Sequence, residues 1–221
     1  MTKVVVLSDT HNQHMQIKDI PDGDILIHCG DATVYGKKDE LEDFLSWFSW
    51  QPHKYKIFVP GNHDEGLFYD GQQPLFKEVS IPEEIIYLEE KYIEIEGLKI
   101  YGSPCKPRPD WALQHKPGVF AAFGVLKSKI KERWDKIPNN LDILITHVPP
   151  YGILDNTGFK HYGCPDLLAA VAEKIPRVHC FGHVHDRYGI LMAEDQKTTF
   201  VNAALCDELY DLNRNPIIME L

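Results

Sequence analysis

The run Ile-Phe-Val-Pro-Gly-Asn-His-Asp occupies residues 57–64 of this 221-residue chain. Its apolar part, Ile57–Val59, is typical of a short buried β-strand, and the glycine and asparagine that follow favour a tight turn. A strand that stops at such a turn presents the next polar side chains at its carboxyl end. Taken alone, Gly-Asn-His-Asp is equally compatible with an ordinary turn, so the rest of the chain decides what this run means.

Four other apolar runs end in the same way, at residues 4–7, 25–29, 143–145 and 178–181. The polar clusters that follow them are Asp9-Thr10-His11, Gly30-Asp31, Thr146-His147 and Gly182-His183-Val184-His185. In an open α/β sheet, the loops beyond the carboxyl ends of the strands converge on one crevice. We therefore expect the five clusters to meet in space, although they span most of the chain.

The side chains in these clusters are suited to divalent transition metals. Aspartate and asparagine oxygens and histidine nitrogens are ligands for manganese, iron or zinc, whereas calcium prefers more oxygen ligands. Residues i and i+2 of an extended segment point the same way, so the spacing predicts that Asp9 with His11, and His183 with His185, each bind one metal. Each cluster alone could arise by chance; their ordered occurrence at five strand ends favours a metal site.

Helical segments and hairpins separate the strand candidates. The expected helix faces are Leu41-Phe44-Leu45-Phe48, Leu126-Ile130-Trp134 and Leu168-Val171-Ile175, the last in a helix that begins at Pro165. Hairpins are predicted over 92–101 and 189–201, with a final strand at 217–219. This mixture predicts an α/β fold with parallel and antiparallel strands covered by helices, in a single domain spanning residues 1–221.

Composition and charge narrow the function classes. Hydrophobic residues make up 43% and charged residues 25%, as in ordinary globular proteins. No apolar run approaches the roughly 20 residues that cross a bilayer, and the first strand candidate is too short for a signal peptide, so a cytoplasmic location is expected by default. Five isolated cysteines argue against a disulfide framework or a thiolate zinc site. A net charge of −10 favours a small phosphorylated substrate over duplex nucleic acid.

The ordered set Asp-x-His, Gly-Asp, Gly-Asn-His-Asp, His and Gly-His-x-His resembles the calcineurin-like metallophosphoesterases over essentially the whole chain. The runs at 8–11, 27–31, 102–104, 146–150 and 181–185 are similar to the brain protein 239 branch, whose members are class III cyclic-nucleotide-phosphodiesterase-like. The resemblance implies a four-layer α/β/β/α sandwich of two mixed sheets flanked by helices. One departure is that Asp31 is followed by alanine rather than the Arg-Gly of the protein phosphatases, which counts against that activity and against bis-nucleoside tetraphosphatases.

The resemblance also implies a complete set of ligands for two metal ions, manganese or iron with zinc as an alternative. They are Asp9, His11 and His185 at the first metal, Asn62, His147 and His183 at the second, and Asp31 bridging both. Some brain protein 239 relatives have glycine where this chain has His183, so a full dinuclear centre is expected here. His63 resembles the family histidine that contacts phosphate and protonates the leaving oxygen, with Asp64 or Asp9 available to orient it.

The expected reaction is hydrolysis of a small phosphodiester, such as a cyclic nucleotide, by a hydroxide shared between metals roughly 3.5–4 Å apart. A phosphomonoester is the second choice; a single-strand nuclease and a non-catalytic metal-binding scaffold are the alternatives, and the oligomeric state stays open. Other polar and aromatic residues are interpreted as packing before function: His28 and His179 in strands, Lys106, Arg108 and Trp111 in a proline-rich loop, Asn156 and His161 after a turn, and Trp47 with Trp50 on a helix.

Overall fold

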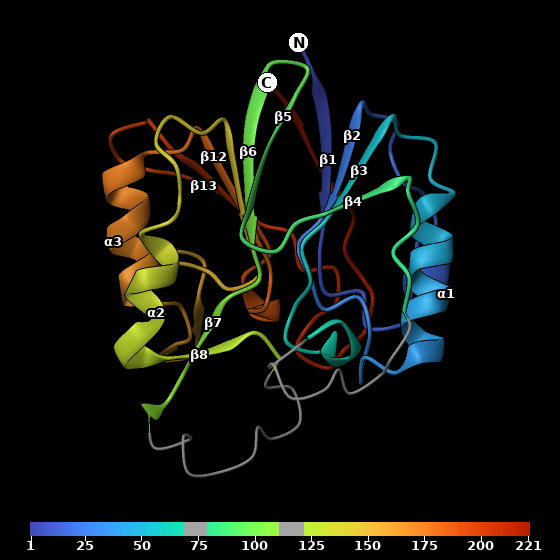
Figure 1. The fold of residues 1–221 in the computed structure, drawn as a ribbon, viewed down its shortest axis with the longest axis horizontal. Coiled ribbons are helices and arrows are strands. Elements are labelled where there is room, and N and C mark those ends of the chain that lie inside the picture. The colour runs from blue at the N-terminus through green and yellow to red at the C-terminus, as the bar shows by residue number, and fades with distance from the viewer. Residues whose placement is uncertain (69–78, 111–121) are drawn as a thin grey trace.

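The computed structural model describes residues 1–68, 79–110 and 122–221, and its elements form four layers (Figure 1). Two sheets lie face to face in the middle. Helix α1 (Lys38–Ser49) covers the outer face of one sheet, and helices α2 (Lys127–Trp134) and α3 (Pro165–Lys174) cover the other. The α/β/β/α sandwich implied by the resemblance is therefore confirmed.

The first sheet has the strand order β15-β1-β2-β3-β4. Four strands are parallel and the edge strand β15 is antiparallel: β1 (Lys3–Leu7), β2 (Ile25–His28), β3 (Tyr55–Phe58), β4 (Ile85–Tyr87) and β15 (Ile217–Glu220). Leu7 pairs with His28, and His28 pairs with Phe58. Because three strands end at one level, the segments carrying Asp9, Asp31 and residues 61–64 leave the sheet side by side.

The second sheet has the order β13-β14-β12-β9-β6-β5. Its strands are β5 (Lys91–Ile95), β6 (Leu98–Ser103), β9 (Ile143–Thr146), β12 (Val178–Phe181), β13 (Gly189–Met192) and β14 (Thr199–Asn202). The inner four are parallel, while β5 and β13 pair antiparallel as the outer strands of the two predicted hairpins. Both hairpins and the final strand are confirmed.

Alternation along the strands explains why they are apolar on both faces. In β1, Val4 and Val6 belong to the core between the sheets, whereas Val5 and Leu7 pack in the layer under α1 with Phe44. Strands buried on both sides have continuous hydrophobic runs. Each fully buried Val or Leu side chain contributes about 1.5–3 kcal/mol through loss of apolar surface from water.

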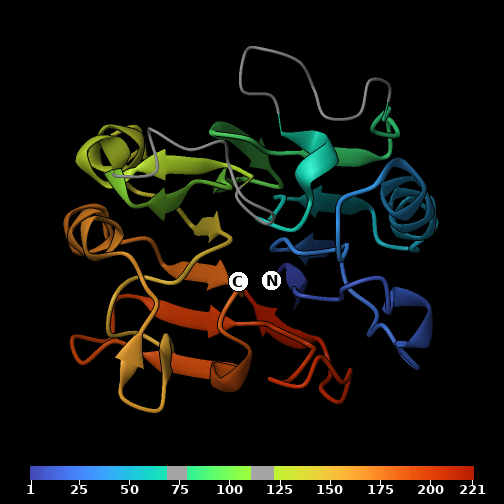
Figure 2. The same cartoon turned by 90° about the horizontal axis from the view of Figure 1, so that it is seen from below.

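Short elements surround the end of the sandwich seen in Figure 2. They are three 3-10 helices, η1 (His14–Gln16), η2 (Glu65–Leu67) and η4 (His185–Arg187), and two ribbons, β7 (Lys106–Arg108) with β8 (Gly124–Leu126) and β10 (Asn156–Thr157) with β11 (Lys160–His161). Among the described residues, no helix is long and apolar enough to cross a membrane.

Three details of the predicted helices are wrong. The buried residues of α3 are Leu167, Ala170 and Val171 rather than the face through residue 168, because the chain turns left-handed at Ile175, which is 41% exposed. Leu126 ends β8 instead of joining α2. Trp50 caps the last turn of α1 and is 84% exposed, so only Trp47 of that pair packs in the core.

Candidate metal centre

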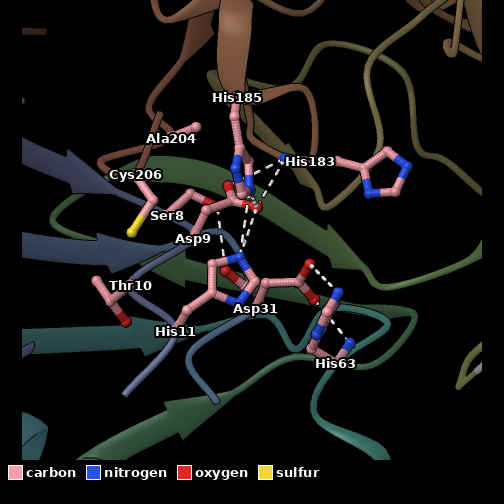
Figure 3. A network of polar contacts seen from close by, with 12 residues as sticks. Ser8, Asp9, Thr10, His11, Asp31, His63, His183, His185, Ala204 and Cys206 are labelled. Carbon is pink, nitrogen blue, oxygen red and sulfur yellow. Dashed lines mark hydrogen bonds and ion pairs between the residues drawn. The ribbon is translucent and has the colours of Figure 1, made fainter. Parts of the chain in front are cut away.

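Two groups of three potential metal ligands lie at the strand ends. The first group is Asp9, His11 and His185, and the second is Asp31, His147 and His183. Within each group the ligand atoms lie within 4.8 Å of one another. Figure 3 shows the side chains of Asp9, His11 and His185 converging, with Asp31 beside them.

Each group combines residues from both sheets. Asp9 and His11 follow β1, and Asp31 follows β2, while the remaining histidines follow β9 and β12 of the second sheet. Asp9 and His11 lie in one group, as the spacing predicts, whereas His183 and His185 lie in different groups. Neither segment is extended, so the i, i+2 rule does not apply to either pair: Asp9 and His11 have φ 53° and 41°, His183 has φ 68°, and His185 starts η4.

Several of the potential ligands have a strained backbone. Asp9, His11, Asp31 and His183 all have positive φ, between 41° and 68°. For residues other than glycine this left-handed conformation costs of the order of 1–3 kcal/mol each and persists where surrounding contacts impose it. The contacts include main-chain hydrogen bonds from Asp9 N–H to Gly30 O at 2.9 Å and from His11 N–H to Asp31 O at 3.2 Å.

Main-chain carbonyls fix the ring orientation of three of the histidines. The Nδ1 atoms lie 3.2 Å from Thr33 O for His11, 2.9 Å from Cys29 O for His147 and 2.9 Å from Asp207 O for His185. A carbonyl only accepts, so each Nδ1 carries the hydrogen and, in the neutral ring, each Nε2 presents its lone pair to the centre. Ligand histidines in metal proteins are oriented in this way by their second nitrogen.

In the first group, two lone pairs face each other. His11 Nε2 lies 3.2 Å from His185 Nε2, and His185 Nε2 lies 3.4 Å from Asp9 Oδ1. Burial lowers the pKa of His11 to about 4, so this imidazole is neutral at physiological pH. Burial raises the pKa of Asp9, but the hydrogen bond and charge of His185 outweigh burial and bring it below its usual range. The arrangement requires a proton or a metal ion between these atoms.

The second group contains a carboxylate, two imidazoles and a neighbouring amide. Asp31 Oδ2 lies 3.2 Å from His147 Nε2, and the rings of His147 and His183 are 5.0 Å apart. Burial lowers the pKa of His147, but the charge of Asp31 outweighs burial and raises it to about 9. Within the described chain, His147 Nε2 contacts the Asp31 carboxylate, and Asn62 Oδ1 is buried without a hydrogen-bond partner. A buried imidazole against a carboxylate, together with an unpartnered amide oxygen, fits a divalent cation.

Two glycines permit this close approach of backbone and carboxylates. A Cβ atom at Gly182 would collide with the Asp9 carboxylate and the Ser8 hydroxyl. A Cβ atom at Gly61 would collide with the Asp31 carboxylate. Any other residue at either position would displace a potential ligand.

His63 lies at the mouth of the centre. Its Nδ1–H donates to Val34 O at 2.8 Å, its Nε2 lies 3.9 Å from Asp31 Oδ2, and its ring meets the ring of His11 edge-on at 4.8 Å. The expectation that Asp64 or Asp9 orients His63 is not met, because the Val34 carbonyl does so. The Asp64 carboxylate instead accepts hydrogen bonds from Gly61 N–H and from Thr33, holding the turn that carries His63. Burial and the neighbouring Asp31 raise the pKa of Asp64 to about 6.

The remaining candidates divide between core and periphery. His28 and His179 are fully buried, as predicted, and hydrogen-bond to Thr10 and Thr146. The other candidates lie at the periphery. The Asn156 carbonyl accepts a hydrogen bond from Arg187 Nε–H. His161 and Lys106 line a cavity beside His183, and Arg108 lies in β7. Trp111 lies outside the described residues.

The sequence prediction misses the segment at 207–211, which covers the first group. The Tyr210 ring lies 4.8 Å from the ring of His11 and 4.9 Å from that of His185. The Asp207 carbonyl orients His185, and the Asp207 carboxylate accepts hydrogen bonds from Leu209 N–H and Asp211 N–H. The one sequence feature that could have indicated this segment is its place in the chain, because it follows β14, a parallel strand of the second sheet. It contains none of the metal-binding motifs.

Comparison with known proteins agrees with this geometry. The model of the calcineurin-like phosphoesterase family matches residues 2–187. The chain belongs to this family. It is 37% identical to UPF0046 protein K07C11.7 of Caenorhabditis elegans over 98% of this chain and 74% of the relative. It is 34% identical to human metallophosphoesterase domain-containing protein 1, over 100% of this chain and 71% of that protein.

The family predicted from the sequence motifs is therefore confirmed. Its fold is also similar to that of the protein TT1561 of Thermus thermophilus, with a TM-score of 0.64 over 91% of this chain and 88% of the other. The two sequences are only 14% identical, so this likeness concerns the fold alone.

Proposed function

We propose that this protein is a phosphoric ester hydrolase that holds two metal ions and hydrolyses small phosphodiesters. The observation that carries the proposal is the pair of adjacent ligand groups, each with three ligand atoms within 4.8 Å. The donors are carboxylate, amide oxygen and imidazole, which suit manganese or iron, with zinc as an alternative. The membership of the family supports hydrolysis of a phosphate ester as the reaction.

The proposed ligands divide between the two ions as the resemblance implies: Asp9, His11 and His185 for one, Asn62, His147 and His183 for the other, and Asp31 between them. Bound ions would lower the pKa of a shared water and offset the negative charge of the phosphate. Two divalent ions carry about +4 against −2 from Asp9 and Asp31, so the loaded centre would attract an anionic ester.

His63 is the proposed general acid. Val34 O holds its Nδ1–H, so the ring presents Nε2 toward the centre, beside Asp31. From this position a protonated Nε2 would hydrogen-bond a phosphate oxygen and donate its proton to the leaving oxygen. Proton transfer of this kind contributes roughly 10²–10⁴-fold to a rate.

A phosphodiester is favoured over a phosphomonoester by charge. A monoester carries one more negative charge than a diester and benefits from an extra cation near the phosphate. The position after Asp31, where the protein phosphatases of the family have arginine, is the fully buried Ala32. No side-chain cation is supplied there, which suits the less charged ester.

The test compares manganese-loaded protein on bis-p-nitrophenyl phosphate and p-nitrophenyl phosphate, followed by 2′,3′- and 3′,5′-cyclic nucleotides. We expect a higher kcat/KM for the diester, and loss of turnover with EDTA. His147→Ala should abolish turnover, whereas the matched control His53→Ala, which removes a buried imidazole bonded to Pro21 O, should retain it. Two bound metals with no hydrolysis of any ester would overturn the proposal in favour of a scaffold.

A further inference from the structure

A cavity of about 580 Å³ lies beside the second ligand group, between β7, the start of α2, β11 and the start of α3. His183 forms part of its wall, so the cavity adjoins the centre directly. Its volume is that of a small-molecule site and far exceeds the space of one phosphate group. It can therefore hold a substrate arm that extends away from the reacting phosphorus.

The charge of this cavity is opposite to that of the protein. The chain has a net charge of −10, yet three lysines, Lys106, Lys127 and Lys160, line the cavity against one carboxylate, Asp166. Pro165, the first residue of the ten-residue helix α3, also lines it, so the positive end of the helix dipole adds to this field.

A second cavity lined in part by His183, of about 350 Å³, has the reverse character. Asp186 and Glu208 line it together with Tyr210, and its wall includes neither lysine nor arginine among the described residues. An extended anion at the centre is therefore attracted toward the lysine side and repelled from the other. The opposite charges of the two cavities would therefore orient a substrate that has one anionic arm, with that arm in the lysine-lined cavity.

Lys106 is the best placed of the three lysines. Its side chain is half-buried, and its ammonium group makes no hydrogen bond or ion pair within residues 1–68, 79–110 and 122–221. By contrast, Arg133 and Lys136 both pair with Glu90. The Lys160 ammonium lies 4.4 Å from the centre of the Tyr162 ring, a cation–π contact that fixes its position at the cavity. A half-buried ammonium without a partner is costly unless an anion completes its hydrogen bonds.

The cavity has an apolar wall as well as cations. Pro107, Pro109, Ile130 and Val148 contribute to it, together with Tyr162. Such a surface suits a sugar or a planar ring placed between the reacting phosphate and a terminal charge. The combination differs from a simple phosphate cradle, which consists of polar groups alone.

We infer that this cavity binds the non-reacting arm of the substrate and that Lys106 and Lys160 bind an oxyanion, a phosphate or carboxylate, at the end of that arm. The inference rests on the proposed function and makes the substrate class narrower: a phosphodiester with a second anionic group on one arm, such as a nucleotide ester carrying an additional phosphate.

The first test compares two esters, thymidine 5′-(p-nitrophenyl phosphate) with and without a 3′-phosphate. Water replaces the p-nitrophenolate in both, and the released p-nitrophenolate is measured. The 3′-phosphate should raise kcat/KM by about 10–100-fold, the effect of a charge-assisted hydrogen bond. Lys106→Met should bring this ratio close to 1, and Lys106→Arg should restore most of it. The control Lys131→Met removes an exposed lysine of α2 paired with Asp135 and should leave the ratio unchanged. An equal ratio in wild type and Lys106→Met would overturn the inference.

The second test does not depend on turnover. Calorimetry on the full-length protein measures the affinity for thymidine 3′,5′-bisphosphate relative to thymidine 5′-monophosphate, with a melting curve for each variant as a folding check. We expect tighter binding of the bisphosphate, lost in Lys106→Met. If that discrimination holds while no ester is hydrolysed, the cavity stands and the proposed function fails. If esters are hydrolysed without discrimination, the proposed function stands and the cavity inference fails.

Discussion

The two sheets supply different chemistry to the centre. The first sheet provides both carboxylates, Asp9 and Asp31, while the second provides His147, His183 and His185 and no carboxylate to either described group. Burial of a carboxylate is costly without a counter-charge, and His147 and His185, whose pKa values burial lowers but the carboxylates raise overall, provide it in the metal-free protein. Neither ligand group exists within one sheet, so packing of the sheets against each other is what assembles the centre.

In one respect the sheets are alike, because each fixes a strand end with a threonine–histidine pair. Thr10 Oγ1 lies 3.1 Å from His28 Nε2 and donates to Ala32 O. Thr146 Oγ1 lies 2.8 Å from His179 Nε2 and donates to Val148 O at 2.7 Å. Since each hydroxyl donates elsewhere, each histidine donates its Nε2–H to the threonine. The same device thus supports chemically different ligands.

The largest expected effect breaks the charge difference between the sheets. Asp31→Asn removes the carboxylate that faces His147, and we expect metal affinity to fall by more than the about 10–100-fold seen for residues that only orient a ligand. Metal content per chain, measured by mass spectrometry, is the check. Asp64→Asn is the control: Asp64 accepts hydrogen bonds from Gly61, Ala32 and Thr33 and belongs to neither ligand group, so its loss should leave metal content intact. Two metals retained by Asp31→Asn would refute a bridging role.

The next effect concerns a first-sheet residue outside both ligand groups. His63→Ala should leave metal content unchanged and lower kcat by roughly 10²–10⁴-fold, because it removes the proposed proton donor. Turnover of bis-p-nitrophenyl phosphate at full metal loading measures this. Unchanged kcat with intact metals would show that His63 has only a structural role.

A smaller effect tests whether the threonine–histidine pairs are equivalent. Thr10→Val and Thr146→Val should each weaken metal binding by about 10–100-fold, because each threonine adjoins a ligand in the chain and holds its backbone. Metal titration of each variant gives the affinity. Serine at either position keeps the hydroxyl and should restore binding; failure of both serine variants would mean that packing, rather than the hydrogen bond, is what matters.

The last prediction concerns the pH dependence of stability of the metal-free protein. Burial lowers the pKa of both His28 and His179 to about 3, against about 6.5 in the unfolded chain. Between these values the unfolded chain binds more protons, so stability is lost as pH falls from about 6.5 toward 3. Each histidine contributes a slope of up to about 1.4 kcal/mol per pH unit. Urea unfolding at several pH values gives the free energy of unfolding as a function of pH. Its dependence on pH should be weaker in His28→Gln and in His179→Gln, by the same amount in both variants. Unequal changes would show that the two histidines do not play equivalent roles in the two sheets.

Much of the fold and of the centre follows from the chain's local pattern. Continuous apolar runs such as Ile25–His28 indicate strands buried on both faces, because polar side chains would be costly on either side. The residue types after each strand already indicate a transition-metal site, since few other sites use aspartate, histidine and asparagine together. The two hairpins were predictable because their short, turn-separated runs pair locally.

Tertiary structure alone decided how those residues combine. The separation of His183 from His185 depends on a left-handed turn at His183 that extended-strand spacing does not represent. The support of His63 by Val34 O, and of His185 by Asp207 O, uses main-chain carbonyls, which have no residue-specific signal. The lysine-lined cavity draws Lys106, Lys127 and Lys160 from three distant elements. The sequence specifies which chemical groups exist and which strands they follow; their distances and charges at the centre arise only when the two sheets pack together.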